Sequence, residues 1–141
     1  MKKHLAILSR NAIKAIISGE KTIEARFSQK KIPPFGVVSA GDIVYMKPPG
    51  EDLIGQFIVT KILFLDGIET SDWIWIKERF SNELSLGSAS DAKNYFKEHQ
   101  EAKYVSIMTI GKVEQFITSP IKIIKKDLRG WLVIDEEKHL K

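Results

Sequence analysis

The sequence predicts an α+β fold: a small, mostly antiparallel β-barrel of six or seven strands, with one short early helix and two inserted covering helices. Short runs typical of strands follow one another along the chain, and proline or glycine breaks separate most of them. Segments with helical periodicity occur once near the start and twice in the middle. This order favours sequential hairpins in a barrel over a parallel α/β sheet.

The first third of the chain alternates strand, helix and strand. Residues 5–8 are a short apolar run typical of a central strand, and the apolar residues of 11–18 repeat with the spacing of a helix face. Gly19 follows directly, as expected of a residue that takes positive φ at a helix C-cap. From residue 22 to residue 28 the apolar period changes to two, which predicts the second strand.

A loop and a hairpin are predicted next. Consecutive prolines in residues 29–36 exclude ladder hydrogen bonds, and the lysines and phenylalanine of this loop either flank a ligand cleft or are simply solvated and packed. Residues 43–47 and 53–65 are predicted strands that pair across a turn at residues 48–52. The second of these is long for one strand, so a bulge is expected near residues 60–61.

The two inserted helices are expected at about residues 70–84 and 88–100, each after a serine or threonine that can cap it. Residues 104–117 then alternate imperfectly around Gly111, which indicates either two strand segments or one kinked strand. A final strand is expected within residues 128–134.

The candidate site lies at the corner where the first helix ends and the second strand begins. Period-two alternation places Thr22, Glu24 and Arg26 on one face of the strand, and the apolar residues between them face the core. Lys21 stands at the mouth of the strand, and we expect the side chains of Lys21, Glu24 and Arg26 to lie within one cleft at the barrel mouth, with Ile23 and Ala25 buried behind them. An ammonium, a carboxylate and a guanidinium together suit a polar, anionic or amide-bearing ligand, although a solvated strand face with a surface ion pair shows the same pattern.

Further cations lie elsewhere in the chain. Lys47 ends its strand beside the proline turn, where a barrel rim is expected, and is either a second cationic contact for the ligand or solvated. Basic residues also cluster at 30–31 and at 122–129. If the fold brings these clusters together, they form a basic patch beside Lys21 that would suit RNA or another polyanion.

The pattern Gly19-x-Lys21-x-x-Glu24-x-Arg26 after a short helix resembles the signature of the ASCH domain family, within the PUA-like superfamily. Further matches lie downstream: Gly41-Asp42 before residues 43–47, the run at residues 54–59, Pro120, and residues 131–133. The resemblance covers about residues 4–134. It implies a PUA-like barrel decorated by helices, a single domain over residues 1–141 with a charged tail at 135–141.

The resemblance first implies a binding module. ASCH and PUA-like domains are linked with RNA, and related barrels hold single bases or modified nucleosides in a cleft. In such a module Lys21 and Arg26 bind a phosphate or a base edge, Glu24 accepts from an exocyclic amine, and an aromatic side chain from the rim stacks. We favour this hypothesis, with RNA, a nucleotide or a nucleoside as the ligand.

The resemblance also implies an alternative, a small hydrolase. One ASCH-like branch cleaves the amide of N4-acetylcytidine with a lysine, a threonine and a distant glutamate. Lys21 matches the lysine, but Glu24 stands at the threonine position and Thr22 lies elsewhere in the pattern. As an amidohydrolase, the chain would therefore use Lys21 and Glu24 as its catalytic residues.

Cleavage of single-stranded RNA by a Lys–Tyr–Ser site is a further activity suggested for such domains. Tyr45, Lys47 and Ser119 match that site loosely. Tyr45 is therefore a candidate ligand contact together with Lys47.

Composition limits these choices. The 141 residues carry a net charge of +4, no cysteine and three scattered histidines, so we expect no disulfide, no metal site and no thiolate chemistry. The sequence contains no phosphate loop, nucleophile elbow or dinucleotide fingerprint, and we expect no cofactor. It contains no signal peptide and no apolar run of membrane-spanning length, which predicts a cytoplasmic protein without a membrane partner. Its oligomeric state is left open.

Overall fold

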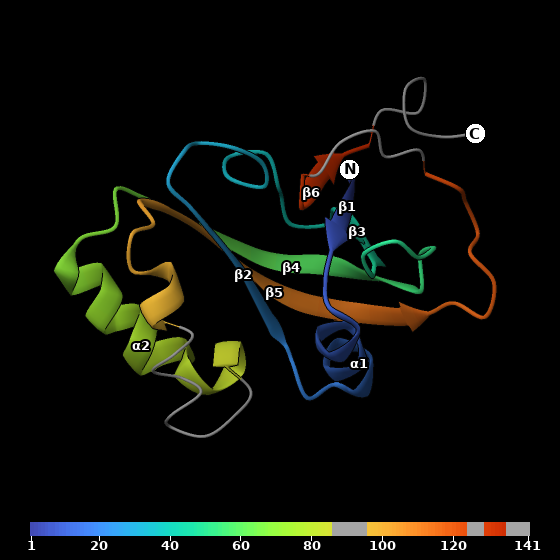
Figure 1. Ribbon diagram of the computed structural model, residues 1–141, viewed down its shortest axis with the longest axis horizontal. Coiled ribbons are helices and arrows are strands. Elements are labelled where there is room, and N and C mark those ends of the chain that lie inside the picture. Colours follow the sequence, from blue (N-terminus) through green and yellow to red (C-terminus); the bar gives the residue numbers. More distant parts are fainter. Residues whose placement is uncertain (86–95, 124–128, 135–141) are drawn as a thin grey trace.

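The computed structural model describes residues 1–85, 96–123 and 129–134, with the backbone alone for residues 81–85. Its elements are β1 (Lys3–Ile7), α1 (Arg10–Ser18), β2 (Ile23–Ser28), β3 (Ile43–Lys47), β4 (Gly55–Asp66), α2 (Thr70–Ser85), β5 (Tyr104–Gln115) and β6 (Trp131–Val133) (Figure 1). Residues 96–99 are also helical. The rest of the second inserted helix that the sequence predicts, and the predicted tail, lie outside the described residues.

The strands form one six-stranded sheet in the order β2-β5-β4-β3-β1-β6. β1 and β3 run parallel, and every other neighbouring pair is antiparallel. The sheet curls into a half-barrel, with the short edge strand β6 and the end of β1 across from the edge strand β2 (Figure 1). The predicted α+β, mostly antiparallel barrel is therefore confirmed.

The pairing of the long strands β4 and β5 is irregular. Their register shifts twice, between Gln56 and Ile58 and between Val59 and Lys61, which confirms the bulge predicted near residues 60–61. Beside the second shift, a Cβ on Gly111 would stand 2.4 Å from the side chain of Thr60, so this position accepts only glycine without a rearrangement. β5 is one kinked strand rather than two segments.

Hydrophobic clusters cover both faces of the sheet. On the concave face, α1 packs into a core with Val44, Met46, Phe57, Val59, Met108 and Trp131. On the convex face, Ile76 and Phe80 of α2 cover the apolar side chains of β2 and β5, which are Ile23, Ala25, Val105 and Ile107. A third cluster lies outside β1, β3 and β6 and comprises Leu5, Tyr45, Leu53 and Leu132.

The ends of α1 set the position of the segment that follows it. The Ser9 hydroxyl accepts a hydrogen bond from the amide of Ala12 at 3.1 Å, which caps the N-terminus. Gly19 ends the helix with φ of +85°, a left-handed conformation that favours glycine. The amide of Lys21 then donates to the carbonyl of Ala15 at 2.9 Å, which folds the chain back against the helix as β2 begins.

Within the described residues, no helix is both long enough and apolar enough to cross a membrane.

Candidate functional site

Lys21, Glu24 and Arg26 converge inside the half-barrel. Lys21 and Glu24 are only 5% and 6% exposed, and the Lys21 Nζ lies 3.6 Å from Glu24 Oε1. On the other side of the same carboxylate, Arg26 Nε lies 3.9 Å from Glu24 Oε2. One buried carboxylate therefore stands between two cations.

Both faces of β2 are largely buried, whereas alternation alone allows its polar face to be either enclosed in a cleft or solvated. Alternation assigned the apolar residues Ile23 and Ala25 to the core and left Glu24 and Arg26 on an opposite, polar face. The apolar face is indeed buried, beneath α2, but the polar face is turned into the concave side of the curled sheet. The sheet's curvature, which strand periodicity does not reveal, is the physical reason that this face is enclosed.

Glu24 also covers the free edge of β2. Its Oε1 accepts a hydrogen bond from the amide of Ala25 at 3.0 Å, an amide on the side of β2 that has no neighbouring strand. Its Oε2 is buried without a hydrogen-bond partner among the described residues. An edge strand with unpaired amides invites pairing with other chains, and the carboxylate satisfies one of these donors internally.

Arg26 links β2 to the other edge of the sheet. Its Nη2 donates to the carbonyl of Ile7 at the end of β1 at 2.8 Å, and its Nη1 donates to the carbonyl of Gly130 at 3.3 Å. The guanidinium carbon also lies 5.3 Å from the centre of the Trp131 ring in β6. We call this gap between β2 and the β1–β6 edge the seam. Across it, a side chain makes the contacts that a backbone ladder would make in a closed barrel.

Two buried hydrogen bonds in sequence connect Trp131 to His4 and His4 to Asp42. The indole N–H donates to Nδ1 of His4 at 3.2 Å, and His4 Nε2 lies 2.8 Å from Asp42 Oδ2. Because an indole N–H can only donate, Nδ1 must accept, and the proton of the neutral imidazole lies on Nε2 and is donated to Asp42. His4 is fully buried.

The pKa values of His4 and Asp42 follow from burial and hydrogen bonding. Burial lowers the pKa of His4 below its ordinary 6.5, and this effect outweighs the opposing influence of Asp42. Burial alone would raise the pKa of Asp42. The hydrogen bonds that it accepts from His4 and from the amides of Lys2 and Ser39 are stronger in effect, and the pKa of Asp42 is lowered.

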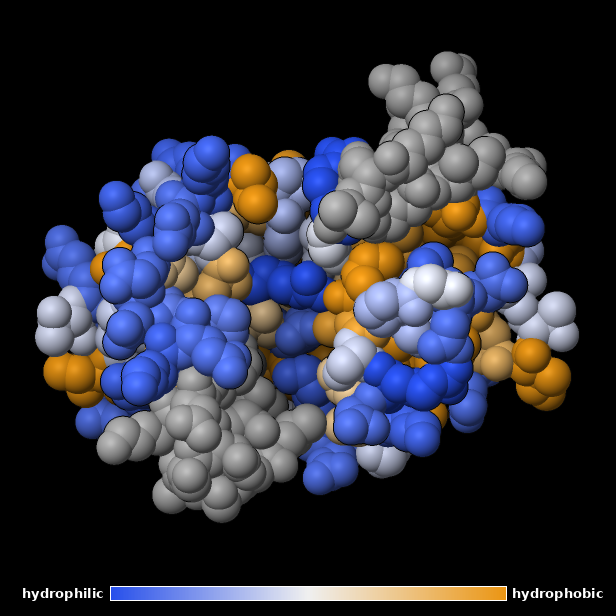
Figure 2. All heavy atoms as spheres, viewed as in Figure 1, coloured by the Kyte–Doolittle hydropathy of each residue, from blue (hydrophilic) through white to orange (hydrophobic). Residues whose placement is uncertain are grey.

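A cavity of about 120 Å³ opens at the seam. Its lining residues come from β2, the proline loop, β5 and the start of β6: Arg26, Phe27, Ser28, Ile32, Pro33, Pro34, Phe35, Ser106, Gly130 and Trp131. Figure 2 shows a furrow with hydrophilic residues at its floor, which crosses the centre of this face between the α2 part and the α1 part. The cavity walls are largely aromatic and apolar, and Arg26 brings a positive charge to them.

The proline loop thus flanks a cleft, one of the two roles that its sequence allowed. Phe35 packs against Phe64 and Tyr104 with ring centres 5.3 Å and 5.2 Å apart, which fixes this wall of the cavity. Lys31 forms an ion pair with Asp66 at 2.9 Å. Its Nζ also lies 5.7 Å from the centre of the Tyr104 ring.

The other predicted contacts lie apart from this cavity. Tyr45 and Lys47 belong to the opposite face of β3, where Tyr45 is 6% exposed and packs on Phe116, and Lys47 donates to the carbonyl of Pro48. The Ser119 hydroxyl donates to the carbonyl of Ile121 at 2.6 Å. Thr22 is exposed at the entrance to β2. The structure therefore joins Lys21 and Glu24 to Arg26 but does not bring Tyr45, Lys47 or Thr22 into the seam cavity.

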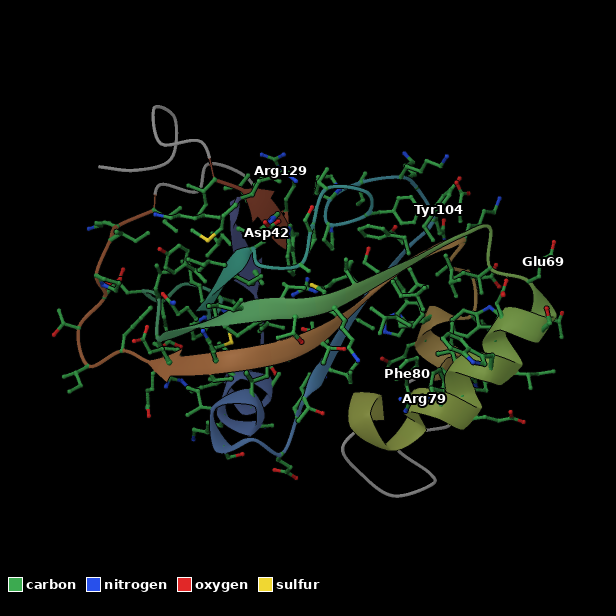
Figure 3. All side chains as sticks on the ribbon, turned by 180° about the vertical axis from the view of Figure 1, so that it is seen from behind. Asp42, Glu69, Arg79, Phe80, Tyr104 and Arg129 are labelled. Carbon is green, nitrogen blue, oxygen red and sulfur yellow. The ribbon has the colours of Figure 1, made fainter. Side chains whose placement is uncertain are left out.

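Sequence reasoning missed three residues of this region: His4, Ser106 and Trp131. Ser106 stands opposite Arg26 in the β2–β5 register, and Trp131 stands opposite Ala6 in the β1–β6 register. Only the pairing of strands far apart in the chain reveals these positions. Figure 3 shows Asp42 and Arg129 beside β6, whereas Arg79 and Phe80 lie on α2.

Comparison with known proteins gives a match in structure alone. No family model matches the sequence, and no curated protein matches it. The crystal structure of an ASCH protein from Zymomonas mobilis superposes with a TM-score of 0.63 at 18% identity, over 96% of this chain and 90% of that one. The fold is that of an ASCH domain. A serine-to-alanine variant of the same protein gives a TM-score of 0.62 at 18% identity, over 96% of this chain and 90% of that one.

A tyrosine-to-phenylalanine variant of the Zymomonas protein matches over 97% of this chain and 93% of that one, with a TM-score of 0.63 at 18% identity. The ASCH fold therefore extends over nearly the whole chain. Within it, the described residues contain no group of three histidine, cysteine, aspartate or glutamate side chains that could hold a metal ion.

Proposed function

We propose that this ASCH-type module binds a single unstacked base, presented by RNA or by a free nucleoside, in the seam cavity. The observation that carries the proposal is the cavity itself, about 120 Å³ between Phe35 and the Arg26–Trp131 pair. This volume suits one planar ring rather than a large ligand, since drug-sized molecules occupy pockets of roughly 300–1,000 Å³. Aromatic rings and arginine planes are the surfaces on which proteins stack single bases.

The charge around the cavity supports a ligand with phosphates. Lys30 is exposed and lies two residues after the cavity residue Ser28. The Ser28 hydroxyl donates a hydrogen bond to the carbonyl of Lys30 at 2.6 Å. Arg129 is exposed and directly precedes the cavity residue Gly130. Chain connectivity thus places a cation on each side of the seam, where backbone phosphates of an RNA strand would pass while one base enters the cavity.

Lys21 and Glu24 support Arg26 from within in this proposal. Both are more than nine-tenths buried and neither lines the cavity, whereas Arg26 lies between Glu24 and the cavity. The Glu24 carboxylate holds the Arg26 guanidinium close to the seam, and the ammonium group of Lys21 offsets the negative charge of Glu24. Direct contact of Lys21 or Glu24 with a ligand stays a prediction.

Binding measurements with two kinds of ligand test the proposal. Isothermal titration would use the four ribonucleosides and a short mixed-sequence single-stranded RNA, each at low and at moderate salt. We expect RNA affinity to fall steeply with salt because phosphate contacts release counterions, and nucleoside affinity to stay nearly constant. Salt-independent binding of nucleosides alone would identify a free nucleoside as the ligand; no binding of either kind would contradict the proposal.

An amidohydrolase is the second candidate, and the buried Lys21–Glu24 pair is the observation in its favour. Hydrolysis of N4-acetylcytidine by the wild type, its loss in Lys21→Arg and its increase in Glu24→Thr would establish this activity. Arginine keeps the positive charge but does not readily release a proton. The separation of both residues from the cavity lining favours the binding module.

A further inference from the structure

Ser106 is an unusual residue in the wall of the seam cavity. Its side chain lies on the concave face of β5, opposite Arg26 in the register, and the residue is only 1% exposed. The hydroxyl nevertheless has no hydrogen-bond partner among the described residues. A buried hydroxyl without a partner weakens the folded state, because the unfolded chain hydrogen-bonds it to water.

The other polar side chains of the same cavity already have partners. The Ser28 hydroxyl donates to the carbonyl of Lys30, and the two terminal nitrogens of Arg26 donate to the carbonyls of Ile7 and Gly130. Ser106 therefore differs from them in burial and in bonding at once. Of the two side-chain hydroxyls that line the cavity, it alone can donate a new hydrogen bond without breaking one that the described residues show.

We propose that Ser106 reads the polar edge of the base that enters the seam cavity, and that it thereby selects nitrogen heterocycles over apolar rings of similar shape. This inference rests on the proposed function and names the contact that gives it specificity. A hydroxyl rotates freely and either donates to a ring nitrogen or carbonyl, or accepts from an exocyclic amine. A ring without such a group would leave the hydroxyl buried and unsatisfied, which disfavours its binding.

The substitution Ser106→Ala separates a ligand contact from a structural one by the signs of two effects. Removal of an unsatisfied buried hydroxyl should leave the unfolding midpoint unchanged or raise it. In the same protein, affinity for the best-binding ribonucleoside should fall about 3- to 10-fold, the loss expected for one hydrogen bond. Urea unfolding and isothermal titration on the full chain measure the two quantities.

Ser18→Ala is the matched control, since the Ser18 hydroxyl donates to the carbonyl of Ala15 at the end of α1 and Ser18 does not line the cavity. This variant should lose some stability and keep most of its affinity. Ser106→Cys adds a slightly larger side chain that still donates, but weakly, and its affinity should lie between those of the wild type and Ser106→Ala.

A ligand without the polar group completes the test. The analogue is the best-binding nucleoside without its exocyclic amine or carbonyl. The wild type should bind this analogue more weakly than it binds the parent nucleoside, whereas Ser106→Ala should bind the two about equally well. Ser106→Ala with unchanged nucleoside affinity, or with a clear loss of stability, would overturn the inference and leave the proposed function standing. A wild type that binds no nucleoside and no RNA would overturn both.

Discussion

The two faces of β2 and β5 are both buried, but by different means. On the convex face, Ile23 and Ile107 pack beneath Ile76 of α2 without a polar atom among their side chains. On the concave face, Glu24 and Arg26 replace apolar packing with charge pairs and with contacts across the seam. The convex face stabilises the sheet through buried area, whereas the concave face gives up part of that stability and gains a cavity that carries the positive charge of Arg26.

The largest effect should come from removal of Glu24. Glu24→Ala leaves Lys21 buried without its carboxylate, so we expect a loss of about 3–5 kcal/mol in unfolding free energy. Chemical denaturation at neutral pH measures it. The double variant Lys21→Met with Glu24→Leu should recover most of the loss, because well-packed apolar residues often replace a buried ion pair at no cost. No recovery in the double variant would show that the pair stabilises the concave face directly.

Ile76→Ala probes the convex face. Ile76 is fully buried beneath α2, and truncation should cost about 2–5 kcal/mol because a cavity replaces its side chain. Ligand affinity of the folded fraction should not change, since Ile76 does not line the seam cavity. A ligand affinity that fell together with stability would contradict the separation of the two faces.

Arg26→Lys tests the contacts across the seam. A lysine keeps the charge but cannot donate to two carbonyls in a fork, so we expect a loss of about 1–3 kcal/mol in stability together with weaker base binding. Denaturation and titration of the same preparation measure both. Unchanged binding by Arg26→Lys would show that its charge alone matters to the ligand.

Acid should weaken the fold through His4, the smallest of these effects at neutral pH. The pKa of His4 is lowered in the native state, so the unfolded chain binds more protons as the pH falls below 6.5. The stability from neutral His4 is complete above that pH and declines as the pH falls towards the lowered native pKa. Protonation at Nδ1 would also break the bond from Trp131.

Unfolding midpoints measured between pH 7.5 and pH 5 check this expectation. His99 needs its own control, because burial also lowers its pKa and would give a slope of the same sign. Two variants, His4→Gln and His99→Gln, separate the two contributions. A slope that persists undiminished in His4→Gln would assign the acid sensitivity to another group.

Local patterns predicted most of the elements, because helices and strands leave periodic marks in the sequence. Residues 43–47 form a strand within the predicted limits, and the bulge near residue 60 lies where strand length required one. The convergence of Lys21 and Glu24 on Arg26 was also foreseen. These features depend on neighbours within a few residues, which a sequence pattern can show.

The seam itself could not be predicted in this way. Arg26 meets Gly130 and Trp131 through the pairing of β6 with β1, and Ser106 faces the cavity through the register of β5 against β2. Alternation separates Tyr45 from its neighbours on β3 but does not say which face of the sheet becomes concave. Curvature and long-range pairing decide that, and neither leaves a mark on a single strand.

The side-chain closure of the seam has a consequence for the order in which the chain matures during synthesis. Arg26 and Gly130 are 104 positions apart, so the ribosome makes β2 long before the strand that β2 faces. Strands β2 to β5 can assemble with α2 while the seam is still an open side of the sheet. The seam cavity is complete only once Trp131 has docked against β1, so β6 is the strand that would complete the proposed binding site on an already folded scaffold.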